Sequence, residues 1–258
     1  MIIEEVLLKL QNELKKFIKK SPNLKHFLWD SFNDHRNRYK DDLDLIKKIH
    51  KDGKILDIGS NPFHLLFCLK ELGLDVVGVD IDPKRFKSFI NNYKLKVAKC
   101  NIESERLPFG NNTFGLIIFN EVFEHLRVDP IKALKEINRV LKPGGTLILT
   151  TPNLYAIHKI VMFNIGKSFN NAYHEFNQLN IYGYVGHIRE YSTTEVRQFL
   201  EKSNFKVEGV IYRNPYSFFK YEGFKNPFLK TMGLIIDILM FLVPVWRRDQ
   251  VILAKKVG

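Results

Sequence analysis

Apolar and polar positions alternate in blocks along this chain, and the blocks predict a regular succession of strands and helices. Short apolar runs of strand length cover residues 54–58, 75–80, 95–100, 114–120 and 145–151. Stretches with a helical period lie between them, over 62–73, 84–93 and 129–142. Strands that alternate with helices in this way form a parallel sheet with helices on both faces. The pattern therefore predicts the α/β fold class.

Two helices are predicted ahead of the first strand. Residues 2–20 have a helical period, and one apolar face is formed by Val6, Leu7, Leu10, Leu14 and Phe17. Ser21-Pro22 ends this helix, because the residue before a proline disfavours the helical conformation. A second helix covers about 35–50. We therefore predict an N-terminal helical cap, residues 1–50, ahead of a main domain, residues 51–258.

The segment over 153–190 interrupts the alternation of strands and helices. It is rich in Asn, Tyr, Phe and His, and it directly follows the fifth predicted strand. Ligands of open α/β sheets bind beyond the carboxyl ends of the strands, so a long insertion at this point is predicted to be a substrate lid. After it, Ser192 and Glu195 have the spacing of a capping box at the start of a helix that ends near Lys202.

Two further strands are predicted at 205–212 and 249–255, with an apolar helix over about 227–243 between them. Lys230, Arg247 and Arg248 flank this helix, as in helices that lie in a membrane interface. That interpretation predicts peripheral membrane contact through 227–246. A buried helix that covers the sheet is the commoner case, and we favour it. The run is interrupted by Asp237 and Pro244 and is shorter than the ~20 residues of a membrane span.

Composition and net charge indicate which kinds of partner the chain favours. The chain has 258 residues, of which 45% are hydrophobic and 26% charged, as in globular proteins. Its net charge of +12 favours anionic partners such as phosphorylated substrates, acidic glycans, anionic lipids or nucleic acid, although a solvated lysine-rich surface explains the charge equally well. Cys68 and Cys100 form no metal or disulfide pattern, and the N-terminus lacks the features of a signal peptide. We therefore predict a cytoplasmic protein, with peripheral membrane contact as an option.

The first two predicted strands carry the candidate chemistry. Residues 54–58 lead into a loop with Gly59 and then into a helix, and the second strand ends at Asp80, 21 residues after Gly59. A strand, a tight turn, a helix and a second strand with a terminal acid form a nucleotide-binding unit. The acid can accept hydrogen bonds from both ribose hydroxyls. An ordinary strand-to-helix turn without a ligand is the alternative for this segment alone.

Several segments in a fixed order resemble the class I S-adenosylmethionine-dependent methyltransferases that modify small molecules, quinones and glycans. They are Lys54 to Gly59, Val77 to Asp80, Leu107-Pro108-Phe109 with Asn112-Thr113-Phe114, Asn120 to Leu126, Arg139 to Gly145 with Thr151-Pro152-Asn153, and Gly186 to Ser192. The resemblance covers about residues 36–212, and it is the joint order of these segments that is specific. It implies a Rossmann-like, seven-stranded sheet of order 3-2-1-4-5-7-6, in which the last two predicted strands supply the antiparallel pair.

The resemblance implies S-adenosyl-L-methionine as the cofactor and assigns residues to its parts. Those expected around the methionine moiety are Asp57, Gly59, Ser60 and Asn61. Those expected at the ribose and adenine are Asp80, Ile81, Asn101 and Ile102, with Asn120 at the end of the fourth strand.

The chain departs from the family pattern at several of these positions. The second and third glycines of the first motif are Asn61 and Phe63. Asn tolerates left-handed backbone angles better than other non-glycine residues, and Phe63 is expected to start the helix and pack inward. Asn101 replaces an acid at the adenine, and its carbonyl can still accept a hydrogen bond.

Methyl transfer from a sulfonium is an in-line displacement, so positioning matters most and a base helps when the acceptor is a hydroxyl. His187 is the preferred base, and the other catalytic candidates are Glu121, His125 and Tyr191. Glu121, Glu124 and His125 form E-x-x-E-H. This run resembles ubiquinone O-methyltransferases, where the cluster implies a divalent metal. We favour the interpretation that Glu124 and His125 orient the loop, and we predict no metal site.

The predicted function is O-methylation of a small molecule, a sugar or a lipid-linked precursor, including anionic acceptors. One alternative is a methyltransferase that acts on RNA or protein. Adenine-amino methyltransferases place Asn/Asp-Pro-Pro-Tyr/Phe after strand four, where this chain has Asn120-Glu121-Val122-Phe123, which disfavours nucleic acid without excluding it. A second alternative is a degenerate fold that serves as a binding or scaffold module. Asp80 argues against it, because a site without a cofactor needs no ribose partner.

Overall fold

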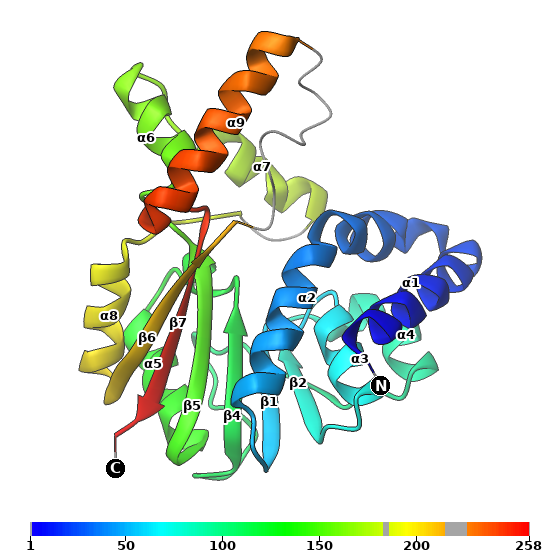
Figure 1. The fold of residues 1–258 in the computed structure, drawn as a ribbon. Coiled ribbons are helices and arrows are strands. Elements are labelled where there is room, and N and C mark those ends of the chain that lie inside the picture. The colour runs from blue at the N-terminus through cyan, green and yellow to red at the C-terminus, as the bar shows by residue number, and fades with distance from the viewer. Residues whose placement is uncertain (1, 183–185, 215–225, 258) are drawn as a thin grey trace. The chain divides into compact units, whose positions relative to one another are not determined.

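The computed structural model describes residues 2–182, 186–214 and 226–257. Its strands form one seven-stranded sheet of order β3-β2-β1-β4-β5-β7-β6 (Figure 1). The strands are β1 (Lys54–Ile58), β2 (Val76–Asp80), β3 (Val97–Lys99), β4 (Phe114–Asn120), β5 (Leu141–Pro152), β6 (Phe205–Arg213) and β7 (Asp249–Lys256). This is the order that the resemblance implied, and the predicted α/β, Rossmann-like fold is confirmed.

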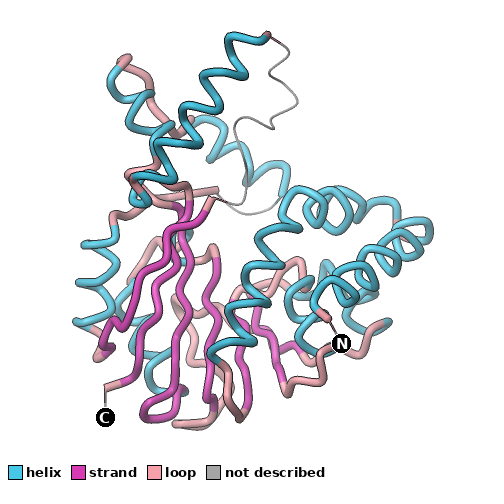
Figure 2. Tube along the Cα trace, in the orientation of Figure 1, coloured by secondary structure: helices cyan, strands magenta, loops and turns pink. Residues whose placement is uncertain are grey.

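Parallel pairing dominates the first half of the sheet. β1 lies between β2 and β4 and is parallel to both, and β2 is parallel to β3. In β1 all residues after Lys54 are buried, because a strand covered on both faces has no side for solvent. Figure 2 shows the run β1–α3–β2 as strand, helix and strand. β6 and β7 pair antiparallel, as expected for the last two strands.

The chain divides into two compact units. Unit 1 covers Met1–Phe119 and Glu136–Leu147, and unit 2 covers Asn120–Lys135 and Ile148–Val257. The helices within unit 1 are α1 (Ile3–Lys20), α2 (Ser31–Ile49), α3 (His64–Glu71) and α4 (Lys87–Asn92). Those within unit 2 are α6 (Ile157–Asn164), α7 (Ala172–Tyr182), α8 (Thr193–Lys202) and α9 (Pro227–Leu242). α5 (Pro130–Val140) contributes residues to both.

The N-terminal helices pack within unit 1. α1 contacts α2 and α3, and its predicted apolar face is buried along its whole length. Phe17 of α1 meets Phe89 of α4 edge to face, with 5.3 Å between the ring centroids. α2 starts at Ser31, earlier than predicted, and follows a π-helical turn over His26–Asp30. The domain boundary at residue 50 stays a prediction.

Two boundaries near the carboxyl end of α5 differ from the predicted ones. The helix ends at Val140 and β5 begins at Leu141, whereas the sequence pattern predicted a helix to 142 and a strand from 145. Both Val140 and Leu141 are fully buried. The next three residues, Lys142 to Gly144, are exposed, so burial does not explain the early start of β5. The predicted lid region contains α6 and α7, except that residues 183–185 lie outside the described part, and its role as a lid stays a prediction.

The favoured interpretation of α9 as a buried helix is wrong. Gly233 and Met240 are buried, but most of its apolar side chains are exposed: Phe228, Met232, Leu234, Ile235, Ile238, Phe241 and Leu242. Among the described residues of this helix only Gly233 and Met240 are fully buried, so its overall apolarity did not indicate burial. None of the helices that the structure describes is long and apolar enough to cross a membrane.

The capping box predicted before α8 is confirmed. The Ser192 hydroxyl accepts a hydrogen bond from the Glu195 amide, and the Glu195 carboxylate accepts one from the Ser192 amide. We expect Ser192→Ala to lower the free energy of unfolding by about 1 kcal/mol, because the helix loses this cap. Urea denaturation followed by circular dichroism measures the change. Thr194→Ala, at an exposed position in the same turn, is the control and should differ little from the wild type.

Candidate active site

The loop after β1 is tied to β2 by one hydroxyl group. Ser60 Oγ donates to the carbonyl of Asp57 at 2.7 Å and accepts from the amide of Val79 at 3.1 Å. The amide of Gly59, whose φ is +72°, donates to the carbonyl of Val79 at 2.8 Å. These bonds hold the loop at the carboxyl ends of two parallel strands, which is where such sheets bind ligands.

Gly78 makes this arrangement possible, and it was not among the predicted site residues. A Cβ atom at Gly78 would lie 2.5 Å from Ser60 Oγ and 2.8 Å from Leu66 Cδ2. Any larger residue would therefore push the loop away from β2. A glycine inside a strand is a sign of such a close approach, so the run Val77-Gly78-Val79 carried the signal.

The left-handed backbone positions of the loop fall on Gly59 and Phe63, not on Asn61. Phe63 has φ +70°, a conformation that costs a non-glycine residue roughly 1–2 kcal/mol. Its ring is fully buried and meets Phe86 at 5.6 Å between centroids, as expected for a residue that packs inward. Burial of a phenylalanine side chain contributes about 1.5–3 kcal/mol, which offsets the backbone cost.

Asp57 is a buried acid at the end of β1 with an unsatisfied oxygen. The residue is 4% exposed, and Oδ2 has no hydrogen-bond partner among the described residues. Burial raises the pKa of its carboxyl to about 7, against the hydrogen bonding of Ser60, which lowers it. A buried carboxyl with a spare acceptor suits a ligand that brings a donor or a positive charge.

Asp80 organises the backbone around the carboxyl end of β2. Its Oδ2 accepts from the amide of Asn61 at 3.1 Å and its Oδ1 from the amide of Asp82 at 2.9 Å. Burial raises the pKa of this carboxyl. Each oxygen still has acceptor capacity for a ribose hydroxyl. Ile81, which follows, is 54% exposed, as a residue that packs against a bound ring would be before binding.

The segment predicted to meet the adenine forms a local turn after β3. Asn101 Oδ1 accepts from the amide of Glu103 at 3.1 Å, and the Asn101 amide donates to Glu105 at 2.8 Å. Ile102 is buried. Unit 1 therefore brings together the loop after β1 and Asp80, and the cofactor roles of these residues stay predictions.

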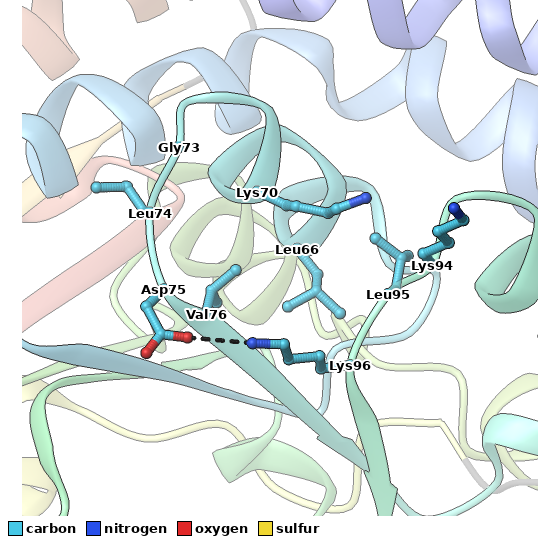
Figure 3. Close-up of a pocket in the computed structure, with 9 residues that line it drawn as sticks. All are labelled: Leu66, Lys70, Gly73, Leu74, Asp75, Val76, Lys94, Leu95 and Lys96. Carbon is cyan, nitrogen blue, oxygen red and sulfur yellow. Dashed lines mark hydrogen bonds and ion pairs between the residues drawn. The ribbon is translucent and has the colours of Figure 1, made fainter.

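A cavity of about 220 Å³ lies elsewhere in unit 1 (Figure 3). It is lined by the end of α3 and by residues that precede or begin β2 and β3, including Lys70, Lys94 and Lys96. Lys96 pairs with Asp75 at 3.5 Å, and Lys70 donates to the carbonyl of Tyr93. The cavity is at the amino ends of the strands, whereas ligands of this fold bind at the carboxyl ends, so we do not assign it to the active site.

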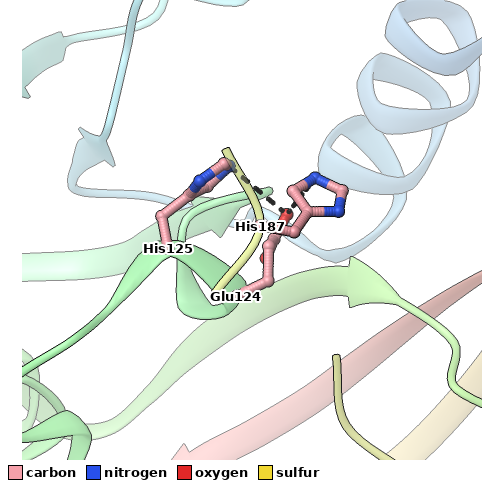
Figure 4. A group of neighbouring side chains, drawn as sticks. All are labelled: Glu124, His125 and His187. Atoms are coloured by element: carbon pink, nitrogen blue, oxygen red, sulfur yellow. Dashed lines mark ion pairs between the residues drawn. The ribbon is translucent and has the colours of Figure 1, made fainter. Parts of the chain in front are cut away.

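Unit 2 carries a cluster of one carboxylate and two imidazoles: Glu124, His125 and His187 (Figure 4). Glu124 follows β4, in the short helical turn Phe123–His125, and is completely buried. Its Oε1 lies 4.0 Å from Nε2 of His125 and 3.9 Å from Nε2 of His187, and no described group donates a hydrogen bond to it. The backbone of the same turn holds the post-lid segment, because the Glu124 carbonyl accepts from the amides of Ile188 and Arg189.

A second layer of groups orients the cluster. His125 Nδ1 donates to the carbonyl of Gly186 at 3.0 Å, and His187 Nδ1 donates to Glu190 at 3.3 Å. Each neutral imidazole therefore carries its lone pair on Nε2, the nitrogen nearer Glu124. Thr151 Oγ1 donates to the other oxygen of Glu124 at 2.8 Å, and Lys159 forms a buried ion pair with Glu190.

Sequence reasoning missed Thr151, Lys159 and Glu190 as site residues. Thr151 and Glu190 lie inside segments that carry the family resemblance, which was the available signal. Lys159 lies in the predicted lid and gives no such signal, because its role depends on the fold bringing α6 to Glu190.

Burial sets the protonation of the cluster. It raises the pKa of Glu124 to about 8, with a smaller contribution from the Glu121 carboxylate. Burial by itself would lower the pKa of His187, but the hydrogen bond to Glu190 and the charge of Glu124 outweigh it, and the pKa is raised. The cluster is therefore able to hold a proton near neutral pH.

The same donors fit a divalent cation. The three candidate ligand atoms lie within 4.8 Å of one another, and two histidines with one carboxylate form a common set for transition metals. Imidazole ligands usually donate their other nitrogen to a carbonyl or a carboxylate, as His125 and His187 do. The unsatisfied, buried Glu124 Oε1 would gain the partner that it lacks.

The remaining predicted residues lie beside this cluster within unit 2. Asn120 Oδ1 accepts from Thr150 Oγ1 at 2.9 Å. The Glu121 amide donates to the carbonyl of Thr150, and the φ of Glu121 is +55°, a left-handed conformation that is uncommon for a non-glycine residue. Tyr191 is buried with its ring against Phe123, at 4.8 Å between centroids. The catalytic roles of Glu121 and Tyr191 stay predictions.

Comparison with known proteins identifies relatives in sequence. A family model described as a methyltransferase domain matches residues 32–210. An uncharacterized protein of Methanocaldococcus jannaschii is 28% identical over 219 residues, which are 78% of this chain and 83% of that protein. A ubiquinone biosynthesis O-methyltransferase of Cereibacter sphaeroides is 31% identical over 116 residues, 43% of this chain and 47% of that enzyme. The chain thus spans about half the length of this second relative.

Solved structures share the fold. A SAM-dependent methyltransferase of Archaeoglobus fulgidus has a TM-score of 0.58 at 17% identity, over 88% of this chain and all of that one. A protein of Pyrococcus horikoshii also has a TM-score of 0.58 at 17% identity, over 87% of this chain and 91% of that one.

We expect Gly78→Ala to lower the free energy of unfolding by about 1–3 kcal/mol, because the new methyl group displaces the Ser60 loop. Urea denaturation measures the loss. Gly209→Ala in β6 is the matched control, since a Cβ there meets nothing within 4 Å. Equal stabilities of the two variants would contradict the close approach at Gly78.

Asp57 should make stability depend on pH in a defined direction. Its pKa is raised from 3.8 to about 7, so folding favours the protonated carboxyl, and this contribution is lost as the pH rises through about 7. Asp57→Asn removes the titration and should be more stable than the wild type at pH 8, by on the order of 2 kcal/mol or more, with a smaller gain at pH 5. Urea denaturation at pH 5, 6, 7 and 8 measures this, with the exposed Asp82→Asn as the control. A gain that does not change with pH would exclude a raised pKa at Asp57.

Proposed function

This chain belongs to the methyltransferase-domain family and uses S-adenosylmethionine as its methyl donor; we propose that it methylates an oxygen atom of a small molecule, a sugar or a lipid-linked acceptor. The observation that carries this proposal is the oriented cluster of Glu124, His125 and His187, which can take up the proton of a hydroxyl group.

Unit 1 supplies the residues for the donor. The cofactor provides a methyl group on a sulfonium, which is a good leaving group, so the protein's task is to hold it. Asp57 offers a buried oxygen for the ammonium group of the methionine moiety, and Asp80 offers two oxygens for the ribose hydroxyls. Ile81 is placed to pack on the adenine. Ser60 and Gly78 hold the loop after β1 against β2 and so keep the carboxyl groups of Asp57 and Asp80 in fixed positions.

Unit 2 supplies the groups for the acceptor. A hydroxyl becomes a good nucleophile when a base takes its proton as the new bond forms. His187 is the base in this proposal, because Glu190 holds its Nδ1 and leaves the lone pair on Nε2. The Glu124 carboxylate lies 3.9 Å from that nitrogen and stabilises the positive charge that develops on it.

A divalent cation held by Glu124, His125 and His187 is a second way for the same cluster to act. It would lower the pKa of a bound hydroxyl and orient an acceptor with two neighbouring oxygens. The donor set and the outer hydrogen bonds of the two histidines favour this alternative.

The class of acceptor is inferred from charge and from relatives. The net charge of +12 favours acceptors with phosphate or carboxylate groups. A relative with 31% identity over part of the chain is a ubiquinone biosynthesis O-methyltransferase, which supports oxygen as the methylated atom. Transfer to RNA or protein is the rival outcome of an acceptor screen. The cysteines Cys68 and Cys100 are both free and buried, which supports a reducing compartment such as the cytoplasm.

Asp80→Ala should weaken the binding of S-adenosylmethionine by about 1.5–3 kcal/mol, roughly 10- to 150-fold, because charge-assisted bonds to the ribose are lost. Calorimetric titration with S-adenosylmethionine and S-adenosylhomocysteine measures this. Asp82→Ala removes an exposed neighbouring carboxylate and is the control. Unchanged affinity in Asp80→Ala would overturn the ribose assignment, and a wild-type protein that binds neither compound at millimolar concentration would favour a scaffold module.

His187→Gln should lower the rate of methyl transfer by about 10²- to 10⁴-fold with the affinity for the donor unchanged, because the base is lost. Transfer of a labelled methyl group, screened on phosphorylated and lipid-linked sugars and on phenols, measures this rate. His174→Gln, an exposed histidine of α7, is the control.

Metal analysis separates the two roles of the cluster. If His187 acts as a base, a chelator leaves the wild-type rate and melting temperature unchanged. If the cluster holds a cation, the purified protein contains about one divalent ion per chain, the chelator lowers both quantities, and Glu124→Gln loses the ion.

A further inference from the structure

α9 exposes apolar side chains on the side where a helix of a water-soluble domain usually has polar ones. Going round the helix, the side toward Gly233 and Met240 is buried. The opposite side carries the exposed residues Phe228, Thr231, Ile235, Ile238 and Leu242, and the exposed Phe241 lies on its flank. Phe241 is 75% exposed and Ile238 is 49% exposed. Helices of water-soluble domains place charged residues on the side away from the core. A continuous apolar face in this position marks an interaction surface.

Hydrogen bonds fix both ends of α9. The Asn226 side chain accepts a hydrogen bond from the Phe228 amide at 2.8 Å and caps the N-terminus. Arg247, which flanks the helix in the sequence, donates to the carbonyls of Met240 at 3.0 Å and Tyr212 at 2.9 Å. These bonds fix the end of α9 to β6. Hydrogen bonds at both ends of α9 therefore hold the exposed face in place.

A second segment of unit 2, α6 with Ile165 after it, also exposes apolar side chains and begins next to the residues that follow α9. α6 exposes Val161 and Phe163, and Ile165 follows it with 59% of its surface exposed. Asn153, just before α6, donates to the carbonyls of Val245 and Arg247, just after α9. In Figure 1 both helices rise from the same end of β5, β6 and β7. We define the α6–α9 surface as Val161, Phe163, Ile165, Phe228, Ile235, Ile238, Phe241 and Leu242.

We propose that the α6–α9 surface binds the interface of an anionic lipid bilayer, with α9 parallel to the membrane plane. α9 has 16 residues and contains Asp237, and it is not long and apolar enough to cross a membrane. An apolar helical face that cannot span a membrane and that the described residues leave exposed is suited to the headgroup region. The exposed cations Lys167, Lys230 and Arg248 lie close in sequence to the apolar residues and can meet lipid phosphates.

Charge favours a bilayer over a second copy of the chain. Two copies, each with a net charge of +12, repel each other as their surfaces approach. An anionic bilayer attracts the same charge. The surface is independent of the proposed O-methylation, although a protein at a bilayer would meet lipid-linked acceptors there.

Vesicle flotation tests the proposal with the whole protein. We expect the wild type to bind vesicles of phosphatidylcholine with 30% phosphatidylglycerol, to bind pure phosphatidylcholine at least fivefold less, and to lose part of its binding in high salt. The double variant Ile238→Glu with Phe241→Glu should lose at least tenfold in partition coefficient. Leu8→Glu, the same change at an exposed leucine of α1 in unit 1, is the matched control and should bind as the wild type does.

A second readout uses the two tryptophans of the chain. In a Trp29→Phe background only Trp246, beside the end of α9, fluoresces, and brominated lipids should quench it. Absence of wild-type binding to anionic vesicles, or full binding by the double variant with intact circular dichroism, would overturn the proposal. So would a dimer in light scattering that the double variant abolishes while no vesicles bind, because the surface would then join two copies.

Discussion

The hydroxyl of Ser60, bound between the carbonyl of Asp57 and the amide of Val79, forms the hydrogen bonds on which the loop proposed to hold the methyl donor depends. It fixes the loop after β1 to the end of β2, and with it the positions of Asn61 and of the Asp80 carboxylate that the Asn61 amide contacts. The bond requires Gly78, since any side chain there would occupy the space of the hydroxyl. The motif that resembles a glycine loop is held in this chain by Ser60, by Gly78 of β2 and by the buried ring of Phe63.

Asp57 in unit 1 and Glu124 in unit 2 are both buried carboxyl groups with an unsatisfied oxygen. Asp57 Oδ2 and Glu124 Oε1 both lack a hydrogen-bond donor among the described residues, and burial raises the pKa of both groups. Such groups reduce the stability of a fold, because a desolvated polar atom without a partner is costly. In the proposed function, Asp57 serves the methyl donor and Glu124 serves the acceptor. The cost is consistent with sites that are completed by a ligand, a proton or a cation.

The apolar face of α9 is the third place where the structure departs from the pattern of a self-contained globular domain. Hydrogen bonds from Arg247 and Asn153 hold the C-terminal end of the helix and the segment after it, while α9 exposes Phe228, Ile235, Ile238, Phe241 and Leu242 together with Lys230. The bilayer proposed for this face would cover it, and the net charge of the chain favours an anionic one.

The sequence by itself determined the order of strands and helices, the family and the position of the nucleotide-binding unit. Those features depend on local periodicity and on short motifs such as Ile55 to Gly59 and Val77 to Asp80, whose conformations are set by residues close in the chain. The start of α8 was predictable for the same reason, because Ser192 and Glu195 form a local capping box.

Only the tertiary structure decided which side chains meet and which apolar residues remain outside. His125 and His187 lie far apart in the chain, and their approach to Glu124, like the pairing of Lys159 with Glu190, depends on how the post-lid segment packs in unit 2. The left-handed backbone of Phe63 is tolerated because Phe86 packs against its ring, a contact that no local pattern records. α9 reads as a core helix in the sequence and is exposed in the fold, because hydrophobicity measures the tendency to leave water and not whether a neighbouring surface is present to receive the helix.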